Sequence, residues 1–346
     1  MKNLENINIC FCFDKNQWMQ AGVTITSLLK SAHGKCHYNI YCIISDNVIE
    51  SFQNDLKNIV NDIDAQSTIT FKKVSDNYDN LYASKHLSTA AYFRLQIHKL
   101  LPDLERIIYC DVDIIFQTDL LELYNTDIGD NLLGAVLDTD LLNKNKFRHW
   151  CIRNNKNKTL FDLKQLYGHC INSGVLIMNL HQIRKENIEQ KKWSNLLTKK
   201  FYLHDQDILN ISCYKRIKYL DPKFNLLVRT INSKLKTNDI NYKNKITAAV
   251  NNPTIIHYTS KVKPWLHVPV KYFDLWWYFA SKTPFYNILY SNYYTINGQS
   301  PHFTNCILKK KYYLLGIIPI VLTKHYKQKG SKLYLGKLPL LKIKTK

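Results

Sequence analysis

The segment that most constrains this fold is an apolar run, Arg106–Phe116, which two aspartates interrupt near its middle. Apolar residues before Asp111 occupy both faces of an extended chain, and this pattern predicts a strand covered by helices on both sides. Successive side chains of a strand alternate, so Asp111 and Asp113 are expected on one side and Val112 on the other. At a rise of about 3.3 Å per residue, the Cα atoms of the two aspartates lie roughly 6.6 Å apart.

Two carboxylates at this separation predict a cation site. Beside an apolar strand they repel each other, and each loses hydration. A divalent cation removes both penalties, and oxygen ligands favour magnesium, calcium or manganese over zinc. The alternative is a surface turn with two solvated acids, because a bare Asp-x-Asp is common. The apolar residues on either side of the pair argue against that alternative.

Strands and helices alternate along the first third of the chain, which predicts an α/β fold with a mostly parallel, Rossmann-like sheet and flanking helices. The strands expected in the whole chain are 7–13, 38–44, 68–74, 106–116, 132–137, 172–180 and 255–257. Ligands of such sheets bind at the carboxyl ends of strands, where Asp14 and the Asp111/Asp113 pair stand. A helix is expected to begin at Ser88-Thr89. Arg94 lies off its apolar stripe and is expected to be a solvated cation, with a phosphate or ribose contact as the alternative. Residues 142–160 show no clear period and are expected to form a mobile loop.

Charge and cysteine usage limit the partners and the compartment. The chain of 346 residues has a net charge of +21, and no acidic residue follows Asp274. This excess indicates an anionic partner, either nucleic acid, an anionic membrane or a phosphate-bearing substrate. The nine cysteines include no C-x-x-C pair, no apolar run reaches about 18 residues, and the N-terminus lacks a signal-peptide core. We therefore expect a reduced, cytosol-facing protein without a transmembrane helix.

Several motifs occur together in one order. They are Phe11–Asn16 (FCFDKN), Tyr109–Asp113 (YCDVD), Asn172–Leu180 (NSGVLIMNL), Asp205–Asn210 (DQDILN) and His257–Trp265 (HYTSKVKPW). Over about residues 7–270 this ordered set resembles the family-8 retaining glycosyltransferases, whose bacterial members include lipopolysaccharide galactosyl- and glucosyltransferases. The resemblance implies a GT-A fold, a nucleotide-sugar donor (UDP-glucose or UDP-galactose) and a divalent cation, usually Mn²⁺, with Mg²⁺ as the alternative.

The resemblance also implies roles for individual residues. The implied metal ligands are Asp111, Asp113 and His257. The implied nucleotide contacts are Asp14 and Asn16 to the uridine, and Lys263, with Ser260 near it, to the diphosphate. The residues implied around the transferred sugar are Arg94, Asp138, Asn172, Asp205 and Gln206, of which Asp138, Asp205 and Gln206 are the catalytic candidates. Two positions depart from the family pattern, because glycine usually stands where Ser260 is and an acid often stands where Lys15 is.

The expected chemistry follows from these residue types. Cleavage of a sugar–phosphate bond leaves negative charge on the diphosphate, which a metal ion and Lys263 would stabilise. Retention of configuration needs either a nucleophile on the opposite face or attack by the acceptor on the same face. An amide is a poor nucleophile, which disfavours Gln206, and a carboxylate such as Asp205 is chemically better. We favour same-face attack.

The C-terminal part of the chain differs in composition. We predict a catalytic domain over 1–270 and a basic, aromatic, membrane-associating region over 271–346. Residues 272–279 either pack on the catalytic core or lie at a membrane interface. Further on, Lys311–Ile320 recurs as Lys332–Leu340, and apolar residues flanked by lysines suit an anchor on a membrane surface. The alternative for this repeat is a docked hairpin with a basic face.

These observations predict a peripheral enzyme on the inner face of the cell membrane. It would move glucose or galactose from a UDP-sugar to a lipopolysaccharide, lipooligosaccharide or other surface glycan. One alternative is a protein- or self-glucosylating transferase resembling glycogenin, since tyrosine is abundant. A more distant alternative, a nucleic-acid-binding protein, rests on charge alone. No nucleic-acid motif is recognised, so no nucleic-acid partner is expected.

Overall fold

A computed structural model of this protein describes residues 4–74, 89–155, 161–232, 239–259, 261, 263–266 and 270–299, and four strands between 308 and 343. From residue 294 on, it describes the backbone alone. The chain divides into two compact units. One contains residues up to 263 together with 269–284, and the other contains 264–268 and the chain from 285 on. The domain boundary expected at residue 270 stays a prediction.

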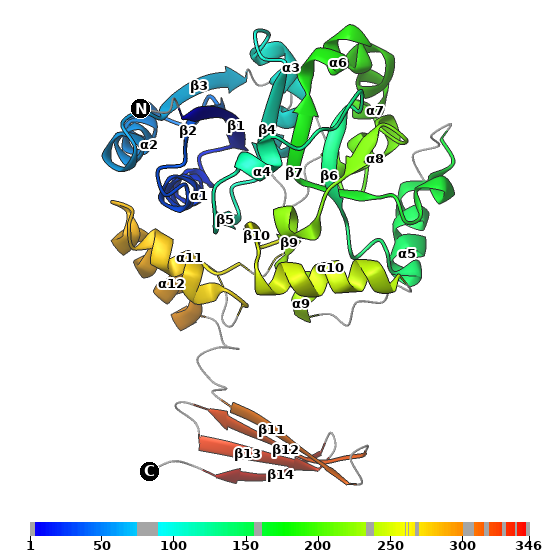
Figure 1. The fold of residues 1–346 in the computed structure, drawn as a ribbon. Coiled ribbons are helices and arrows are strands. Elements are labelled where there is room, and N and C mark those ends of the chain that lie inside the picture. Colours follow the sequence, from blue (N-terminus) through cyan, green and yellow to red (C-terminus); the bar gives the residue numbers. More distant parts are fainter. Residues whose placement is uncertain are drawn as a thin grey trace. The chain divides into compact units, whose positions relative to one another are not determined.

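A seven-stranded sheet forms the centre of the first unit, with strand order β3-β2-β1-β4-β7-β6-β8 (Figure 1). Its strands are β1 (Glu5–Phe13), β2 (Cys36–Ser45), β3 (Thr68–Val74), β4 (Arg106–Cys110), β6 (Leu133–Leu137), β7 (Ile171–Asn179) and β8 (Ile217–Tyr219). Strand β7 runs antiparallel to both of its neighbours, and all other pairs in the sheet are parallel. The predicted α/β class with a mostly parallel sheet is therefore confirmed.

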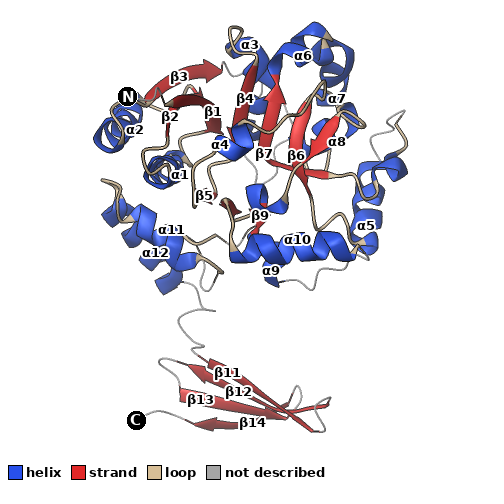
Figure 2. Cartoon of the chain, viewed as in Figure 1, coloured by secondary structure: helices blue, strands red, loops and turns tan. Residues whose placement is uncertain are grey.

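Helices flank this sheet (Figure 2). In the first unit they are α1 (Trp18–Ser31), α2 (Glu50–Ile63), α3 (Ile97–Leu100), α4 (Leu121–Tyr124), α5 (Lys144–Asn154), α6 (Leu180–Lys185), α7 (Ser194–Leu197), α8 (Asp205–Ser212), α9 (Val228–Asn232), α10 (Ile240–Asn251) and α11 (Phe273–Ala280). Short 3-10 helices span Thr89–Gln96, Leu163–Leu166 and Pro222–Asn225, and a π-helical turn spans Glu189–Trp193. Helix α1 is buried along nearly its whole length, because it packs against α2, β5 and α11.

The strand expected over 106–116 is in fact two strands in two sheets. Strand β4 ends at Cys110, and β5 (Ile114–Phe116) belongs to a three-stranded sheet with β10 (Ile255–His257) and β9 (Leu226–Leu227). The hydroxyl of Thr24 on α1 lies 2.9 and 3.0 Å from the carbonyl oxygens of Val112 and Ile114. These contacts hold the crossing segment 111–113 between the two sheets.

One other local expectation was wrong. The loop expected over 142–160 contains helix α5, which Asn143 caps by accepting from the amides of Asn145 and Lys146. The helical period was hidden because one of its three buried positions is polar. That residue, Asn154, donates to Asp207 Oδ2 at 2.8 Å. The helix expected to begin at Ser88-Thr89 is confirmed for the described residues, as the 3-10 helix Thr89–Gln96 followed directly by α3.

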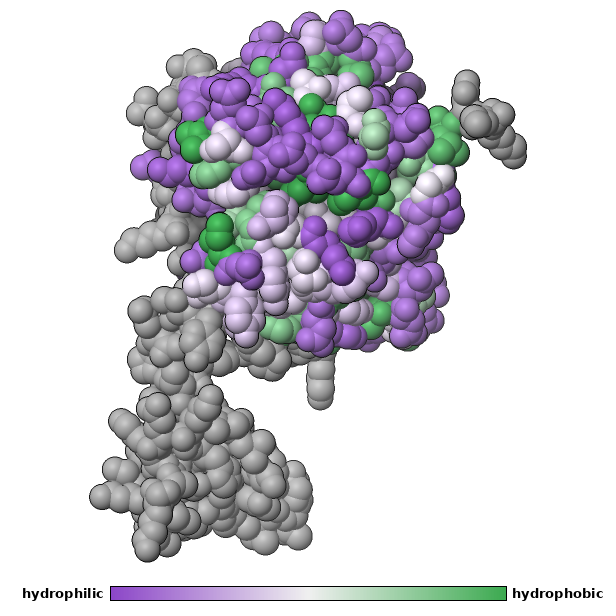
Figure 3. Space-filling model, turned by 90° about the vertical axis from the view of Figure 1, so that its left-hand side faces the viewer, coloured by the Kyte–Doolittle hydropathy of each residue, from purple (hydrophilic) through white to green (hydrophobic). Residues whose placement is uncertain are grey.

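The aromatic segment 272–279 forms most of α11 and belongs to the first unit. Trp276 is completely buried and Phe279 nearly so, whereas Tyr278 is exposed. These burial values favour the interpretation in which the segment packs on the catalytic core. In the first unit, the face drawn in Figure 3 carries mainly hydrophilic residues with smaller hydrophobic areas between them.

The second unit contains helix α12 (Tyr286–Gln299) and an antiparallel sheet of β11 (Leu308–Leu314), β12 (Ile318–Tyr326), β13 (Gly330–Leu335) and β14 (Leu338–Ile343) in that order. The sequence repeat corresponds to two β-hairpins. In each, the pairing shifts register beside a tyrosine that pairs with a proline, Tyr313 with Pro319 and Tyr334 with Pro339. Among the described residues, no helix has the length and apolar character needed to cross a membrane.

Candidate functional site

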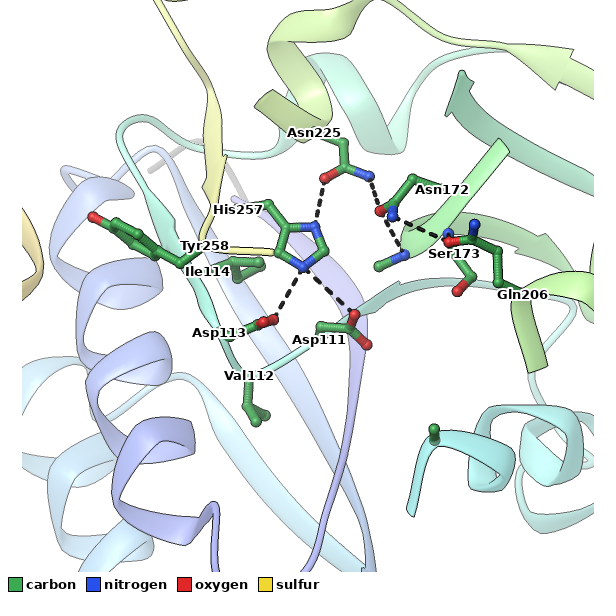
Figure 4. A network of polar contacts seen from close by, with 12 residues as sticks. Asp111, Val112, Asp113, Ile114, Asn172, Ser173, Gln206, Asn225, His257 and Tyr258 are labelled. Atoms are coloured by element: carbon green, nitrogen blue, oxygen red, sulfur yellow. Dashed lines mark hydrogen bonds and ion pairs between the residues drawn. The ribbon is translucent and has the colours of Figure 1, made fainter. Parts of the chain in front are cut away.

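Three potential metal ligands meet where the chain crosses between the two sheets. Strand β10 pairs with β5 so that His257 stands opposite Ile114, next to Asp113 in the chain. His257 Nε2 lies 3.0 Å from Asp113 Oδ1 and 3.6 Å from Asp111 Oδ2. One ligand atom from each residue falls within 4.8 Å of the other two. Figure 4 shows both carboxylates turned toward the imidazole and Val112 turned away, as strand alternation predicts.

Each carboxylate of this cluster has one oxygen held by other side chains, so that its second oxygen is directed at His257. Asp111 Oδ1 accepts from Arg94 Nη2 at 2.8 Å and from the Tyr109 hydroxyl at 2.7 Å. Asp113 Oδ2 accepts from Lys263 Nζ. Burial opposes the ionisation of Asp113, but Lys263 and His257 outweigh it and hold the pKa of this carboxyl well below its usual range.

The chemistry of this donor set fits a divalent cation. Two carboxylate oxygens and an imidazole nitrogen point at one another, and three acceptors at this separation repel unless a proton or a metal ion lies among them. Carboxylates with an imidazole suit Mn²⁺, and carboxylates also suit Mg²⁺. Asp111, Asp113 and His257 are the residues that would hold the ion.

Gly174 on β7 makes room for this cluster. A Cβ atom at this position would lie 2.1 Å from His257 Cε1 and 2.7 Å from Asp111 Oδ2. The backbone carbonyl oxygen of Gly174 also accepts from the backbone amide of Asp111 at 2.8 Å. A side chain at position 174 would therefore displace the imidazole or the carboxylate.

Arg94, expected as a solvated cation, is instead buried beside the cluster. Its Nη2 donates to Asp111, its Nε lies 3.1 Å from Asp205 Oδ2, and its Nη1 donates to the carbonyl oxygen of Ser173 at 2.6 Å. Burial disfavours its charged form, but Asp111 and Asp205 more than compensate, and the pKa of Arg94 is raised. Arg94 thus joins the potential metal ligands to the start of helix α8.

Helix α8 begins against β7, and its first turn supplies Asp205 and Gln206. Asp205 Oδ2 accepts from the Ser173 hydroxyl at 3.1 Å. Burial raises the pKa of Asp205 to about 6, although the Arg94 charge acts in the opposite direction. Gln206 Oε1 accepts from Asn172 Nδ2 at 3.1 Å and from the Ser173 amide at 3.2 Å. The structure therefore brings Asn172, Asp205 and Gln206 together at one edge of the sheet.

Asp138 joins this group from the end of β6. It accepts from Gln206 Nε2 at 3.1 Å, and both of its oxygens accept from Arg229 Nη2, at 2.9 and 2.8 Å. Arg229 Nε also lies 3.2 Å from Asp140 Oδ2. Sequence reasoning missed Arg229 on α9 and Asn225 just before β9. The available signal for Asn225 was an amide inside an apolar run, Phe224–Val228, where a buried polar group needs a partner.

The expected nucleotide contacts lie less centrally. Asp14 directly follows β1, and the neighbouring strand β4 leads into Asp111. Asp14 Oδ1 accepts from the backbone amide of the exposed Asn16 at 2.7 Å. Lys263 reaches the cluster, and its Nζ also donates to the carbonyl oxygen of Tyr258 at 2.7 Å. Ser260 lies outside the described residues. The roles assigned to these residues in nucleotide binding stay predictions.

Comparison with known proteins identifies relatives of this chain. A sequence model described as glycosyl transferase family 8 matches residues 8–268. A putative glycosyltransferase of Haemophilus influenzae is 28% identical over 227 residues, which cover 64% of this chain and 63% of that protein. Lipopolysaccharide 1,2-glucosyltransferase of Escherichia coli K12 is 26% identical over 280 residues, 78% of this chain and 77% of that protein.

A solved structure shares the fold. The crystal structure of the galactosyltransferase LgtC with donor and acceptor sugar analogues superposes with a TM-score of 0.65 at 21% identity. The superposition covers 80% of this chain and 96% of that one. This likeness confirms the expected GT-A architecture.

Proposed function

The chain belongs to glycosyl transferase family 8, and from this premise we propose that it is a metal-dependent, retaining hexosyltransferase. The proposed donor is UDP-glucose or UDP-galactose. The proposed acceptor is lipopolysaccharide, lipooligosaccharide or another surface glycan. A lipopolysaccharide glucosyltransferase and a lipopolysaccharide galactosyltransferase are among its relatives, which supports both the sugar class and the acceptor class.

The observation that carries the proposal is the convergence of Asp111, Asp113 and His257 at the end of β4. A divalent ion held there would supply positive charge against the diphosphate as the sugar leaves. Lys263 would add a second positive charge beside the diphosphate oxygens. Its Nζ stands against Asp113 Oδ2, which places this ammonium at the edge of the cluster.

The contacts of Asp205 support same-face attack by the acceptor. Asp205 Oδ2 is engaged by both the Arg94 guanidinium and the Ser173 hydroxyl, and burial disfavours the charged form of the carboxyl. A carboxylate held in this way serves better to orient and stabilise charge than to swing out as a nucleophile. Gln206, whose amide bridges Asn172 and Asp138, is a positioning group for the sugar.

A donor-hydrolysis panel tests this proposal. Purified protein is incubated with UDP-glucose, UDP-galactose and other UDP-sugars, with and without Mn²⁺. We expect hydrolysis of one UDP-hexose that depends on the metal. Asp113→Ala should abolish turnover and weaken UDP binding only when Mn²⁺ is present.

Asp119→Ala is the matched control for Asp113→Ala, because Asp119 pairs with the exposed Lys35 at 3.1 Å and lies outside the cluster. Equal UDP affinity of the wild type with and without Mn²⁺ would contradict the metal site. A mass ladder of hexose additions on the protein itself would instead indicate a glycogenin-like self-glucosylating enzyme.

The C-terminal sheet supports association with the anionic inner face of the cell membrane. Four lysines, Lys309, Lys324, Lys332 and Lys342, occupy directly paired positions across β11, β12, β13 and β14. We call this set the lysine row. Paired positions on neighbouring strands share one face of a sheet and lie about 4.8 Å apart, where like charges destabilise the pairing. An anionic surface relieves that repulsion, and each lysine near it contributes about 1 kcal/mol.

A further inference from the structure

A continuous chain of side-chain hydrogen bonds joins the proposed metal site to the proposed sugar site (Figure 4). It starts at His257 Nδ1, which lies 2.9 Å from Asn225 Oδ1. Asn225 Nδ2 donates to Asn172 Oδ1 at 2.9 Å, and Asn172 Nδ2 donates to Gln206 Oε1 at 3.1 Å. Gln206 Nε2 then donates to Asp138 Oδ2 at 3.1 Å. His257, Asn225, Asn172, Gln206 and Asp138 are all at least nine-tenths buried.

Contacts with backbone N–H groups determine which side-chain atoms donate and which accept along this series of hydrogen bonds. An amide side chain can be turned by 180° without changing its shape, so its oxygen and nitrogen are assigned from their partners. A backbone N–H, by contrast, can only donate. The backbone amide of Ser173 donates to the Gln206 side-chain atom that also faces Asn172, so this atom must be the oxygen Oε1. The backbone amide of Gly174 donates to the Asn172 side-chain atom that faces Asn225, so this atom must be the oxygen Oδ1. The Asp138 carboxylate at the far end agrees, because it accepts from Gln206 Nε2.

The same logic fixes Asn225 and then His257. The atom of Asn225 that faces Asn172 Oδ1 must be its nitrogen, so its oxygen faces the imidazole. An oxygen at this position requires a hydrogen on His257 Nδ1. The neutral form with its only hydrogen on Nε2 is thereby excluded. In the remaining neutral form, Nε2, the atom directed at Asp111 and Asp113, presents the lone pair that a metal ion needs.

We propose that Asn225 is a positioning residue that preselects the metal-binding form of His257 and ties the orientation of that imidazole to the amides of Asn172 and Gln206. The inference rests on the proposed metal site and adds to it a residue outside the ligand set. Groups that hold the second nitrogen of a ligating histidine fix its ring and its tautomer, and their loss weakens metal affinity by about 10- to 100-fold. Here the Asn225 side chain, which holds Nδ1 of His257, is in turn oriented by Asn172, one of the residues proposed around the transferred sugar.

The test measures the Mn²⁺ concentration that gives half-maximal UDP binding, by calorimetry on the full chain. Asn225→Ala removes the acceptor at Nδ1 and should raise this concentration by about 10- to 100-fold. Asn225→Asp keeps an oxygen at Nδ1 and should return it to within about threefold of the wild type. Asn225→Leu refills the same buried space without an acceptor at Nδ1, so its Mn²⁺ requirement should stay raised; a return to the wild-type value in this variant would mean that Asn225 only fills the core.

Asn225→Asp also distinguishes the effect on the metal site from the effect on the sugar site, which lie at opposite ends of this series of hydrogen bonds. It loses the donor to Asn172 Oδ1, so at saturating Mn²⁺ and donor its kcat should still fall by roughly 10-fold, which is less than the loss of about 10²- to 10³-fold for a donor that acts directly on the reacting atoms. Wild-type kcat in this variant would contradict the proposed tie between the metal site and Gln206.

Asn210→Ala is the matched control. Asn210 is an equally buried amide near β7, but among the described residues its side chain bonds backbone groups, those of Ile171 and Gln206. This variant should lower the melting temperature while leaving the Mn²⁺ requirement unchanged. An Asn225→Ala protein with the wild-type Mn²⁺ requirement would overturn the inference while the metal site stands. A wild type whose UDP binding ignores Mn²⁺ would instead overturn the proposed function.

Discussion

The two units of this chain differ in how their charged residues are arranged. In the first unit, Arg94 and Lys263 stand against Asp111, Asp205 and Asp113, and these acids and bases are largely buried. In the second unit, the sheet aligns lysines of one sign across four strands. The opposite charges that converge inside the first unit support the proposed site for a metal ion and a small ligand. Like charges aligned over the sheet support the proposed anionic membrane surface as a partner.

The largest expected effect comes from closing the space between β7 and His257. In Gly174→Ala, the new methyl group would overlap the imidazole, whose nearest atom lies 2.1 Å from the Cβ position. We expect Mn²⁺-dependent UDP binding to weaken by at least about 100-fold, because a metal ligand is displaced. Gly129→Ala is the control, since an alanine would be strained at the φ of +52° found there but its Cβ would meet no atom within 4 Å. That variant should lose stability and keep metal-dependent UDP binding.

The next effect compares a buried ion pair with an exposed one. Arg94→Lys replaces a guanidinium that reaches Asp111, Asp205 and the Ser173 carbonyl with a single ammonium. Breaking such buried pairs costs about 3–5 kcal/mol, and turnover should fall by roughly 10- to 1,000-fold. Arg216→Lys, at the partly exposed pair with Glu186, should change the free energy of unfolding by less than about 1 kcal/mol. Urea unfolding of both variants measures the difference, and similar losses would remove the distinction.

A smaller effect depends on pH. Asp207 accepts from Trp150 Nε1 and Asn154 Nδ2 and so fastens α5 to α8, and burial raises its pKa to about 7. Between its unfolded pKa of about 4 and its folded pKa, the folded state binds more protons, so this group loses stabilising effect as pH rises. The stability deficit of Asp207→Asn relative to the wild type should therefore shrink between about pH 4 and pH 7. Denaturant unfolding across this range measures it, and a deficit that grows with pH would contradict the assignment.

The smallest effect concerns the C-terminal sheet. Removing residues 306–346 should release the enzyme from anionic liposomes, with activity on a small soluble acceptor retained. Lys324→Gln with Lys332→Gln interrupts the lysine row and should weaken liposome binding several-fold at low salt, at about 1 kcal/mol per lysine. Lys327→Gln with Lys329→Gln removes the same charge at two lysines that do not belong to the lysine row and should do less. Equal losses in a sedimentation assay would mean that net charge matters and the row does not.

Local patterns in the sequence were enough for the main features of the fold. Alternation of apolar strands and helices predicts the parallel sheet, and the spacing of Asp111 and Asp113 places both carboxylates on one side. The ordered motifs gave the family. The repeat in the C-terminal region was visible, but its form as two hairpins was not, because the pairing of strands depends on register as well as composition.

Pairings between distant segments were decided only by the tertiary structure. It ended β4 at Cys110 and sent the chain into a second sheet, where β10 carries His257 to Asp113. It buried Arg94 between two carboxylates, and it set Asn225 and Arg229 beside residues far away in sequence. Side-chain alternation is a property of one strand and can be predicted from a few neighbouring residues. The partner of a buried polar group depends on which segments pack together, and that is settled when the core forms.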